Sequence, residues 1–288
     1  MKLIASDLDG TLLNKNTEVS EENAMKIKEA LEQGIKFVAV TGRPYESAST
    51  LLKEVGVTCP IICLNGANTY TAEGDLIRSA ALDPEMIQTV RQRSMKDNIH
   101  LVYFTETGVF STEKERFIKE LADTFLESMP NISKEKAILG AEQFMIKEHV
   151  QFIDNIEEIL QQTIYKLLTY SGNKDKLSNL YNELKNEQNL AISSSSGSNL
   201  EFNHINAEKG IALKHFAEQL GIDMADVMAI GDNLNDVSML RLVGRPVAMG
   251  NAIDAVKAIC EYTTKTNDEN GVAEAIGKML NDTKVRNG

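Results

Sequence analysis

The sequence predicts an α/β protein with a doubly wound parallel sheet and a second, inserted α+β domain. Two features of the 288-residue chain support this prediction. Both ends of the chain alternate short, continuously apolar segments with segments of helical period, which is typical of parallel strands covered on both faces. In the middle, strand-like segments follow one another and helices come in pairs, which is typical of an α+β unit.

The N-terminal part contains three expected strands and two expected helices. The first strand is a short apolar run that stops at Asp7, and two similar runs follow it. Ser20 can cap the first helix with Asn23 at its third position, and Gly34 can end that helix. We expect strands at 2–6, 35–40 and 60–64 and helices at 20–33 and 45–56.

The pattern changes after about residue 82. Two apolar segments flank Glu106-Thr107-Gly108, a sequence suited to a turn, and therefore predict an antiparallel hairpin. We expect strands at 99–104, 108–112, 164–170, 189–193 and 198–204 and helices at 113–128, 134–148 and 174–186.

The alternation of strand and helix returns after Asn206. We expect helices at 207–220, 234–243, 252–260 and 272–280 and strands at 227–230, 246–249 and 262–264. Because the first and last parts share one pattern, the expected division is a core of 1–82 and 199–288 with an inserted domain at 83–198.

The composition is that of an acidic globular protein, with 42% hydrophobic residues and a formal net charge of -12. No cluster of lysines and arginines is visible, so we expect no nucleic-acid partner and no binding to an anionic membrane surface. The three cysteines predict no disulfide framework, and no apolar run is long enough for a signal peptide or a membrane span. We expect a cytoplasmic protein, and the sequence leaves its oligomeric state open.

Four groups of polar residues stand at the ends of expected strands or at the start of a helix. They are Asp7-Leu8-Asp9-Gly10-Thr11, Thr41-Gly42, Lys209 and Gly231-Asp232-Asn233-Leu234-Asn235-Asp236. Open α/β sheets bind ligands at the carboxyl ends of their strands, so these groups are expected to converge.

Four converging aspartates would repel one another unless a cation lay among them. An all-oxygen site that also receives a phosphate suits Mg²⁺. A metal ion, a lysine and a hydroxyl group are together what phosphoryl transfer requires. For each group taken alone, an ordinary turn, a helix cap or a solvated lysine remains the alternative.

In this order, the four groups resemble the four motifs of the haloacid dehalogenase (HAD) superfamily of phosphohydrolases. The insert resembles in size and position the type IIB cap of Cof-type sugar-phosphate phosphatases, and Val247-Ala248-Met249-Gly250-Asn251-Ala252 also resembles that subfamily. The resemblance implies a Rossmann-like core, an inserted cap that sets substrate specificity, and Mg²⁺ as cofactor.

The resemblance also implies a role for each motif residue. Asp7 would be the nucleophile that forms an aspartyl-phosphate, and Asp9 the general acid and base. The metal would bind Asp7, Asp232 and the backbone carbonyl of Asp9. Asp236 would hold Lys209 or a metal-bound water. The phosphate would bind Leu8, Thr41, the Gly42 amide, Lys209 and Asn235.

Two further residues have two interpretations each. Arg43 would contact substrate or phosphate, or else form a structural ion pair. Asn65 begins a segment, Asn65-Gly66-Ala67, that resembles a family element near the hinge and that is equally well explained as a glycine-containing turn.

The expected function is hydrolysis of small phosphorylated metabolites. Sugar phosphates come first, and flavin mononucleotide and pyridoxal phosphate stay open. The alternatives are a phosphomutase that returns the phosphate to a sugar, which the motifs do not separate from a phosphatase, and a catalytically silent regulator that binds a phosphometabolite.

Overall fold

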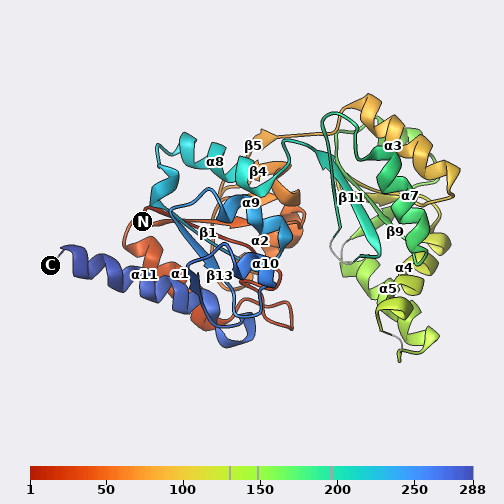
Figure 1. The fold of residues 1–288 in the computed structure, drawn as a ribbon. Coiled ribbons are helices and arrows are strands. Elements are labelled where there is room, and N and C mark those ends of the chain that lie inside the picture. Colours follow the sequence, from red (N-terminus) through yellow and green to blue (C-terminus); the bar gives the residue numbers. More distant parts are fainter. Residues whose placement is uncertain (130, 148, 195–196, 288) are drawn as a thin grey trace. The chain divides into compact units, whose positions relative to one another are not determined.

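The computed structural model describes residues 1–129, 131–147, 149–194 and 197–287. The chain divides into two compact units, a core unit of Met1–Ser79 with Asn206–Gly288 and an inserted unit of Ala80–Ile205. Figure 1 shows both chain ends, red and blue, in the core unit. None of the described helices is long and apolar enough to cross a membrane.

The core unit is built on an eight-stranded sheet in the order β14-β13-β12-β1-β2-β3-β4-β5. The strands from β14 to β3 are parallel, whereas β4 and β5 continue the sheet in antiparallel pairing. This confirms the predicted α/β class. The strands are β1 (Leu3–Ser6), β2 (Lys36–Val40), β3 (Ile61–Cys63), β4 (Asn68–Tyr70), β5 (Leu76–Ser79), β12 (Val227–Gly231), β13 (Arg245–Ala248) and β14 (Tyr262–Thr263).

Strand β1 lies at the centre of this sheet, and all four of its residues are buried. It pairs in parallel with β12 on one side and with β2 on the other. The segments that follow these three strands therefore leave the sheet at the same edge, although they come from opposite ends of the sequence.

Helices cover the core sheet, and α1 and α11 lie side by side (Figure 1). The start of α1 is as predicted, because the Ser20 hydroxyl accepts a hydrogen bond from the Asn23 N–H over 3.2 Å. The helices are α1 (Glu21–Glu32), α2 (Tyr45–Glu54), α8 (Lys209–Gln219), α9 (Val237–Leu240), α10 (Asp254–Lys257) and α11 (Gly271–Asn287).

Four core segments differ from the sequence expectation. Strands β4 and β5 were not expected, because they are short and carry polar residues. The expected helix 234–243 is a 3-10 turn at Leu234–Asp236 followed by the single turn of α9, since Asn233 and Asp236 form a capping box that tightens its start. The expected helix 252–260 shortens to α10.

The inserted unit contains a six-stranded sheet in the order β10-β11-β9-β6-β7-β8. Its main core joins the sheet to α3 and α7 and includes Leu167, Leu180 and the fully buried Phe202. The strands are β6 (Val102–Thr105), β7 (Val109–Ser111), β8 (Val150–Phe152), β9 (Ile164–Tyr170), β10 (Leu190–Ser193) and β11 (Asn199–His204). The helices are α3 (Pro84–Lys96), α4 (Lys114–Ser128), α5 (Lys134–Lys147), α6 (Ile156–Leu160) and α7 (Lys174–Leu184).

The expected hairpin is present, because β6 and β7 pair in antiparallel fashion. Helix α3, strand β8 and helix α6 were not expected, and position 148 of the expected helix 134–148 lies outside the described residues.

Both expected domain boundaries need correction. The second boundary, placed between 198 and 199, is wrong because β11 pairs with β9 and β10 and so belongs to the inserted sheet. The first boundary, between 82 and 83, lies three residues too late. The Leu82 N–H donates to the Ile164 carbonyl over 2.8 Å, which ties that residue to β9. The chain crosses between units after Ser79 and after Ile205.

The placement of β11 predicts a stability effect confined to the inserted unit. Truncating Phe202→Ala removes a fully buried ring from that core and should destabilise the unit by about 3–5 kcal/mol. Denaturant unfolding followed by hydrogen exchange measures the loss unit by unit. Tyr181→Ala on α7, whose ring is exposed, is the matched control. A loss of protection in the core unit instead would contradict the assignment.

Candidate active site

The predicted polar groups follow three neighbouring parallel strands. Asp7 follows β1, Asp232 follows β12 and Thr41 follows β2. Backbone hydrogen bonds fix the first position past two of these strands, from the Asp7 N–H to the Ile230 carbonyl over 3.0 Å and from the Thr41 N–H to the Ile62 carbonyl over 2.8 Å. The sheet register thus delivers these side chains to one edge of the sheet.

Lys209, the first residue of α8, lies between two carboxylates. Its Nζ is 2.6 Å from Asp7 Oδ1 and 2.7 Å from Asp236 Oδ1, and all three side chains are buried. Burial alone would lower the pKa of Lys209, but the attraction of Asp236 and Asp7 outweighs it and raises that pKa. The expected contact between Asp236 and Lys209 is therefore present, and the ammonium stays charged.

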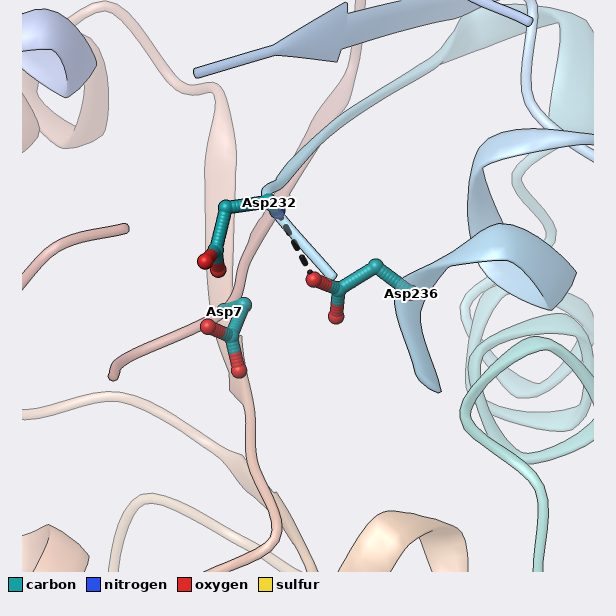
Figure 2. Close-up of side chains that lie close together, drawn as sticks. All are labelled: Asp7, Asp232 and Asp236. Carbon is teal, nitrogen blue, oxygen red and sulfur yellow. Dashed lines mark hydrogen bonds between the residues drawn. The ribbon is translucent and has the colours of Figure 1, made fainter. Parts of the chain in front are cut away.

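The second carboxylate oxygen of Asp236 organises the turn after β12. It accepts a hydrogen bond from the backbone N–H of Asp232 over 2.9 Å (Figure 2). It accepts another from the backbone N–H of Asn233 over 3.0 Å. A Cβ on Gly231 would lie 2.6 Å from Asp236 Cβ, so only glycine fits at that position. Asp236 thus links the lysine to the turn that positions Asp232.

Asp7, Asp232 and Asp236 form a compact acidic group. One carboxylate oxygen from each lies within 4.8 Å of the others. Burial raises the pKa of Asp7 well above its usual range, and the opposing attraction of Lys209 does not cancel this effect. Burial and the neighbouring Asp236 raise the pKa of Asp232 to about 6. With all three carboxylates ionised, the group would hold more negative charge than the single lysine compensates.

These residues fit a divalent cation. The donors are carboxylate oxygens, which Mg²⁺ prefers, and the three carboxylates face a single lysine. Burial and mutual repulsion raise the pKa values of Asp7 and Asp232, and a cation would favour their ionised forms. Lys209 forms ion pairs with Asp7 and Asp236. Among the three described carboxylates, Asp232 is therefore the one without an ion pair to this lysine. Its Oδ1 accepts a hydrogen bond from the Thr11 hydroxyl over 2.9 Å.

Asp9 lies apart from this acidic group and forms an ion pair with Arg43. Arg43 Nε donates to Asp9 Oδ2 over 2.7 Å and Nη2 donates to Oδ1 over 2.6 Å, which occupies both oxygens. Arg43 Nη1 also donates to the Ser47 hydroxyl over 3.1 Å, which anchors the arginine to α2. Of the two interpretations of Arg43, the structure contains the ion pair, and contact with substrate stays a prediction.

A second cluster joins Asn65, Asn235 and Gly42. Asn235 Nδ2 donates to Asn65 Oδ1 over 3.1 Å, and a Cβ on Gly42 would lie 3.2 Å from the same oxygen. Thr41 Oγ1 accepts a hydrogen bond from the Arg43 N–H over 3.1 Å. The side chain of Leu8 is fully buried, so its expected contribution to phosphate binding can come only from its backbone. Phosphate binding by all of these residues stays a prediction.

The sequence patterns predicted no role for two residues that support the site. Thr11 stands within the first motif, but its bond to Asp232 joins residues 221 positions apart. Asn251 Nδ2 donates to the Gly10 carbonyl over 2.8 Å, across a similar separation. Gly10 has a φ of +77°, and a Cβ there would lie 2.5 Å from Asp232 Oδ2. A glycine in the first motif indicates that another group lies close to the backbone there. It does not indicate that this group is Asp232.

Fold and site together define a two-unit α/β enzyme in which carboxylates and one lysine meet at the carboxyl edge of a parallel sheet. Residues 4–276 match the family model of haloacid dehalogenase-like hydrolases, and the chain belongs to that family. The relatives place it among the Cof-type hydrolases, which confirms the resemblance drawn from the four motifs.

The curated relatives include two proteins of Bacillus subtilis (strain 168). The phosphatase YwpJ is 32% identical over 285 residues, which covers 97% of this chain and 100% of the relative. The 5-amino-6-(5-phospho-D-ribitylamino)uracil phosphatase YwtE is 36% identical over 287 residues, which covers 97% of this chain and 98% of the relative.

Solved structures show the same fold. A haloacid dehalogenase-like hydrolase from B. subtilis superposes with a TM-score of 0.83 at 32% identity and covers 96% of this chain and 99% of its own. A subclass IIB sugar phosphatase, BT4131, reaches a TM-score of 0.76 at 20% identity over 97% of this chain and 99% of its own, which shows the shared fold.

The charge excess predicts that Asp232→Asn stabilises the metal-free protein. Because the pKa of Asp232 is raised in the folded protein, ionisation of this side chain lowers the free energy of unfolding. The loss develops as the pH rises from about 4 through about 6. At pH 7.5 in EDTA the variant should therefore melt about 2–4 °C above the wild type, the shift that about 1 kcal/mol produces in a domain of this size. Below pH 4 the two should melt together.

Thermal unfolding with and without Mg²⁺ measures both effects. Added Mg²⁺ should raise the melting temperature of the wild type more than that of Asp232→Asn. Asp226→Asn, which alters an exposed aspartate of the same unit paired with Lys2, is the control. Equal melting temperatures at pH 7.5 in EDTA would contradict the charge argument.

Proposed function

We propose that this hydrolase is a Mg²⁺-dependent phosphatase of small phosphorylated metabolites that works through an aspartyl-phosphate on Asp7. The observation that carries the proposal is the buried Asp7 carboxylate, fixed by Lys209 inside a group of three carboxylates. A nucleophile needs such a fixed orientation, and the phosphatase names of the relatives support the same reaction.

In the first step, an Asp7 carboxylate oxygen attacks phosphorus, and the bond from phosphorus to the ester oxygen breaks. The proton that the leaving oxygen needs comes from the Asp9 carboxyl group. Both oxygens of Asp9 accept hydrogen bonds from Arg43 in the structure, so Asp9 must leave this ion pair before it can donate a proton. In the second step, water attacks the phosphoryl group, Asp9 takes a proton from it, and the bond to Asp7 breaks.

The residues that would hold Mg²⁺ are Asp7, Asp232 and the backbone carbonyl of Asp9. When bound, the ion would supply the positive charge that lets a phosphate approach this acidic group. Lys209 adds a fixed positive charge and keeps Asp7 oriented, while Asp236 holds Lys209 in place. Thr41, the Gly42 amide and Asn235 would donate hydrogen bonds to phosphate oxygens, together with the Leu8 backbone.

The proposed substrates are sugar phosphates and related phosphate monoesters, and the inserted unit is proposed as the source of specificity. Two relatives, YwtE and YcsE of B. subtilis, carry the name 5-amino-6-(5-phospho-D-ribitylamino)uracil phosphatase, at 36% and 32% identity. A phosphorylated sugar alcohol attached to a heterocycle is therefore included, and flavin mononucleotide belongs to the same chemical class. Pyridoxal phosphate completes the panel to be screened.

The mechanism predicts that Asp7→Asn abolishes turnover. The amide is neutral and a poor nucleophile, so phosphate release should fall by at least about 1,000-fold, and EDTA should have the same effect on the wild type. Phosphate release across the substrate panel measures both. Asp226→Asn should keep full activity. Turnover that survives both Asp7→Asn and EDTA would overturn the mechanism.

A second measurement tests the covalent step directly. Asp9→Asn should still form the aspartyl-phosphate from an activated aryl phosphate, because such a leaving group needs no proton, but should hydrolyse it slowly. Rapid quenching and mass spectrometry of the peptide that contains Asp7 would detect an added phosphoryl group. Absence of this adduct, with steady phosphate release, would show that water attacks the substrate directly.

A further inference from the structure

The loop after β3 has an unusual backbone. Leu64, Asn65 and Gly66 have φ angles of 49°, 56° and 99°, so three consecutive residues lie in the left-handed region and two of them are not glycine. Such a conformation persists only where the surroundings hold it. On one side, the Leu64 N–H donates to the Arg43 carbonyl over 3.1 Å and the Asn65 N–H to the Thr41 carbonyl over 2.9 Å.

On its other side the loop packs against the backbone that leads into Lys209. A Cβ on Gly66 would lie 2.5 Å from the Glu208 carbonyl oxygen, so the two backbones are in direct contact there. The loop carries Asn65, which binds Asn235. The segment opposite carries Lys209, which binds Asp7. The contact therefore brings together two parts of the proposed phosphate site.

Arg78 on β5 holds this contact together. Its Nη1 donates to the Gly66 carbonyl, and its Nη2 donates to the Asn206 carbonyl over 2.7 Å. Burial lowers the pKa of this guanidinium, yet an arginine remains charged at neutral pH. Among the described residues, no carboxylate lies within ion-pair distance of it. Both recorded hydrogen bonds of Arg78 go to backbone carbonyls.

We propose that Arg78 is a positioning residue that sets the spacing of the phosphate site by clamping the loop 64–66 to the segment 206–208. The rigid, forked guanidinium suits this task because it reaches two acceptors at a fixed separation. Arg78 lies two residues before the inserted unit begins, and Asn206 is the first residue after it. One side chain thus joins both chain crossings to the loop of Asn65. This inference rests on the proposed phosphatase function.

The test is steady-state kinetics of Arg78→Ala with inorganic phosphate as a competitive product inhibitor. The substitution should change the relative positions of Asn65, Asn235 and Lys209. Because small misplacements weaken binding strongly, KM for the best substrate and Ki for phosphate should rise together by about tenfold or more. Since Asp7 and Lys209 keep their direct contact, kcat should change less than KM. Arg78→Lys, which places a single ammonium where the fork was, should give an intermediate result.

Arg245→Ala is the matched control, because Arg245 belongs to the same unit and pairs with Asp282 at 2.7 Å. It should leave KM and Ki unchanged. If Arg78→Ala fails to fold, the same criteria apply to Arg78→Lys. A folded variant with KM and Ki both within twofold of the wild type would overturn the proposal, and so would a fall in kcat alone.

A failure of the proposed function would give a different result. In that case wild-type protein would release no phosphate from any ester of the panel in the presence of Mg²⁺. Calorimetric binding of inorganic phosphate to the wild type and to Arg78→Ala then tests the clamp without turnover. Equal affinities would overturn the role of Arg78, whereas affinity at least about tenfold weaker in the variant would support it.

Discussion

The site depends on one buried contact, in which the ammonium of Lys209 lies between the carboxylates of Asp7 and Asp236. Burying these charges is costly, and their mutual attraction offsets the cost only while all three remain in place. The contact also joins distant parts of the core, since Asp7 follows β1, Lys209 begins α8 and Asp236 ends the turn after β12. Removing Lys209 would leave two carboxylates in the interior without their counter-charge.

The same contact explains how an acidic protein can bind a phosphate. With 42 acidic and 30 basic residues, the chain as a whole repels anions at long range. At the site, however, Lys209 is held fixed and Asp232 adds negative charge that one lysine does not compensate. A divalent cation among these oxygens would cancel the local excess of negative charge, so local charges decide binding where the net charge would oppose it.

The sequence predicted the parts of the site that depend on the order and direction of the strands. Continuous apolar runs predicted β1, β2 and β12, and parallel pairing then required Asp7, Thr41 and Asp232 to meet at one edge. The contact of Asp236 with Lys209 was also expected, but most side-chain partners could not be predicted. The fork of Arg43 on Asp9 depends on rotamers, and the bond of Asn251 to Gly10 spans 241 positions. Strand β11 was assigned to the wrong unit because no local pattern states its sheet partners.

The four motif carboxylates lie in two environments. Asp7, Asp232 and Asp236 are in the compact group, where Asp7 and Asp236 are buried and share the Lys209 ammonium. The Asp9 side chain is 56% exposed, while the Arg43 side chain that binds it is only 10% exposed. A group that must give a proton to one oxygen and take one from water needs access to solvent, whereas a nucleophile must be shielded and fixed. The exposure of Asp9 and the burial of Asp7 therefore match the separate roles proposed for them. Only one residue separates the two aspartates in the motif, so their spacing alone does not predict that they lie in different environments.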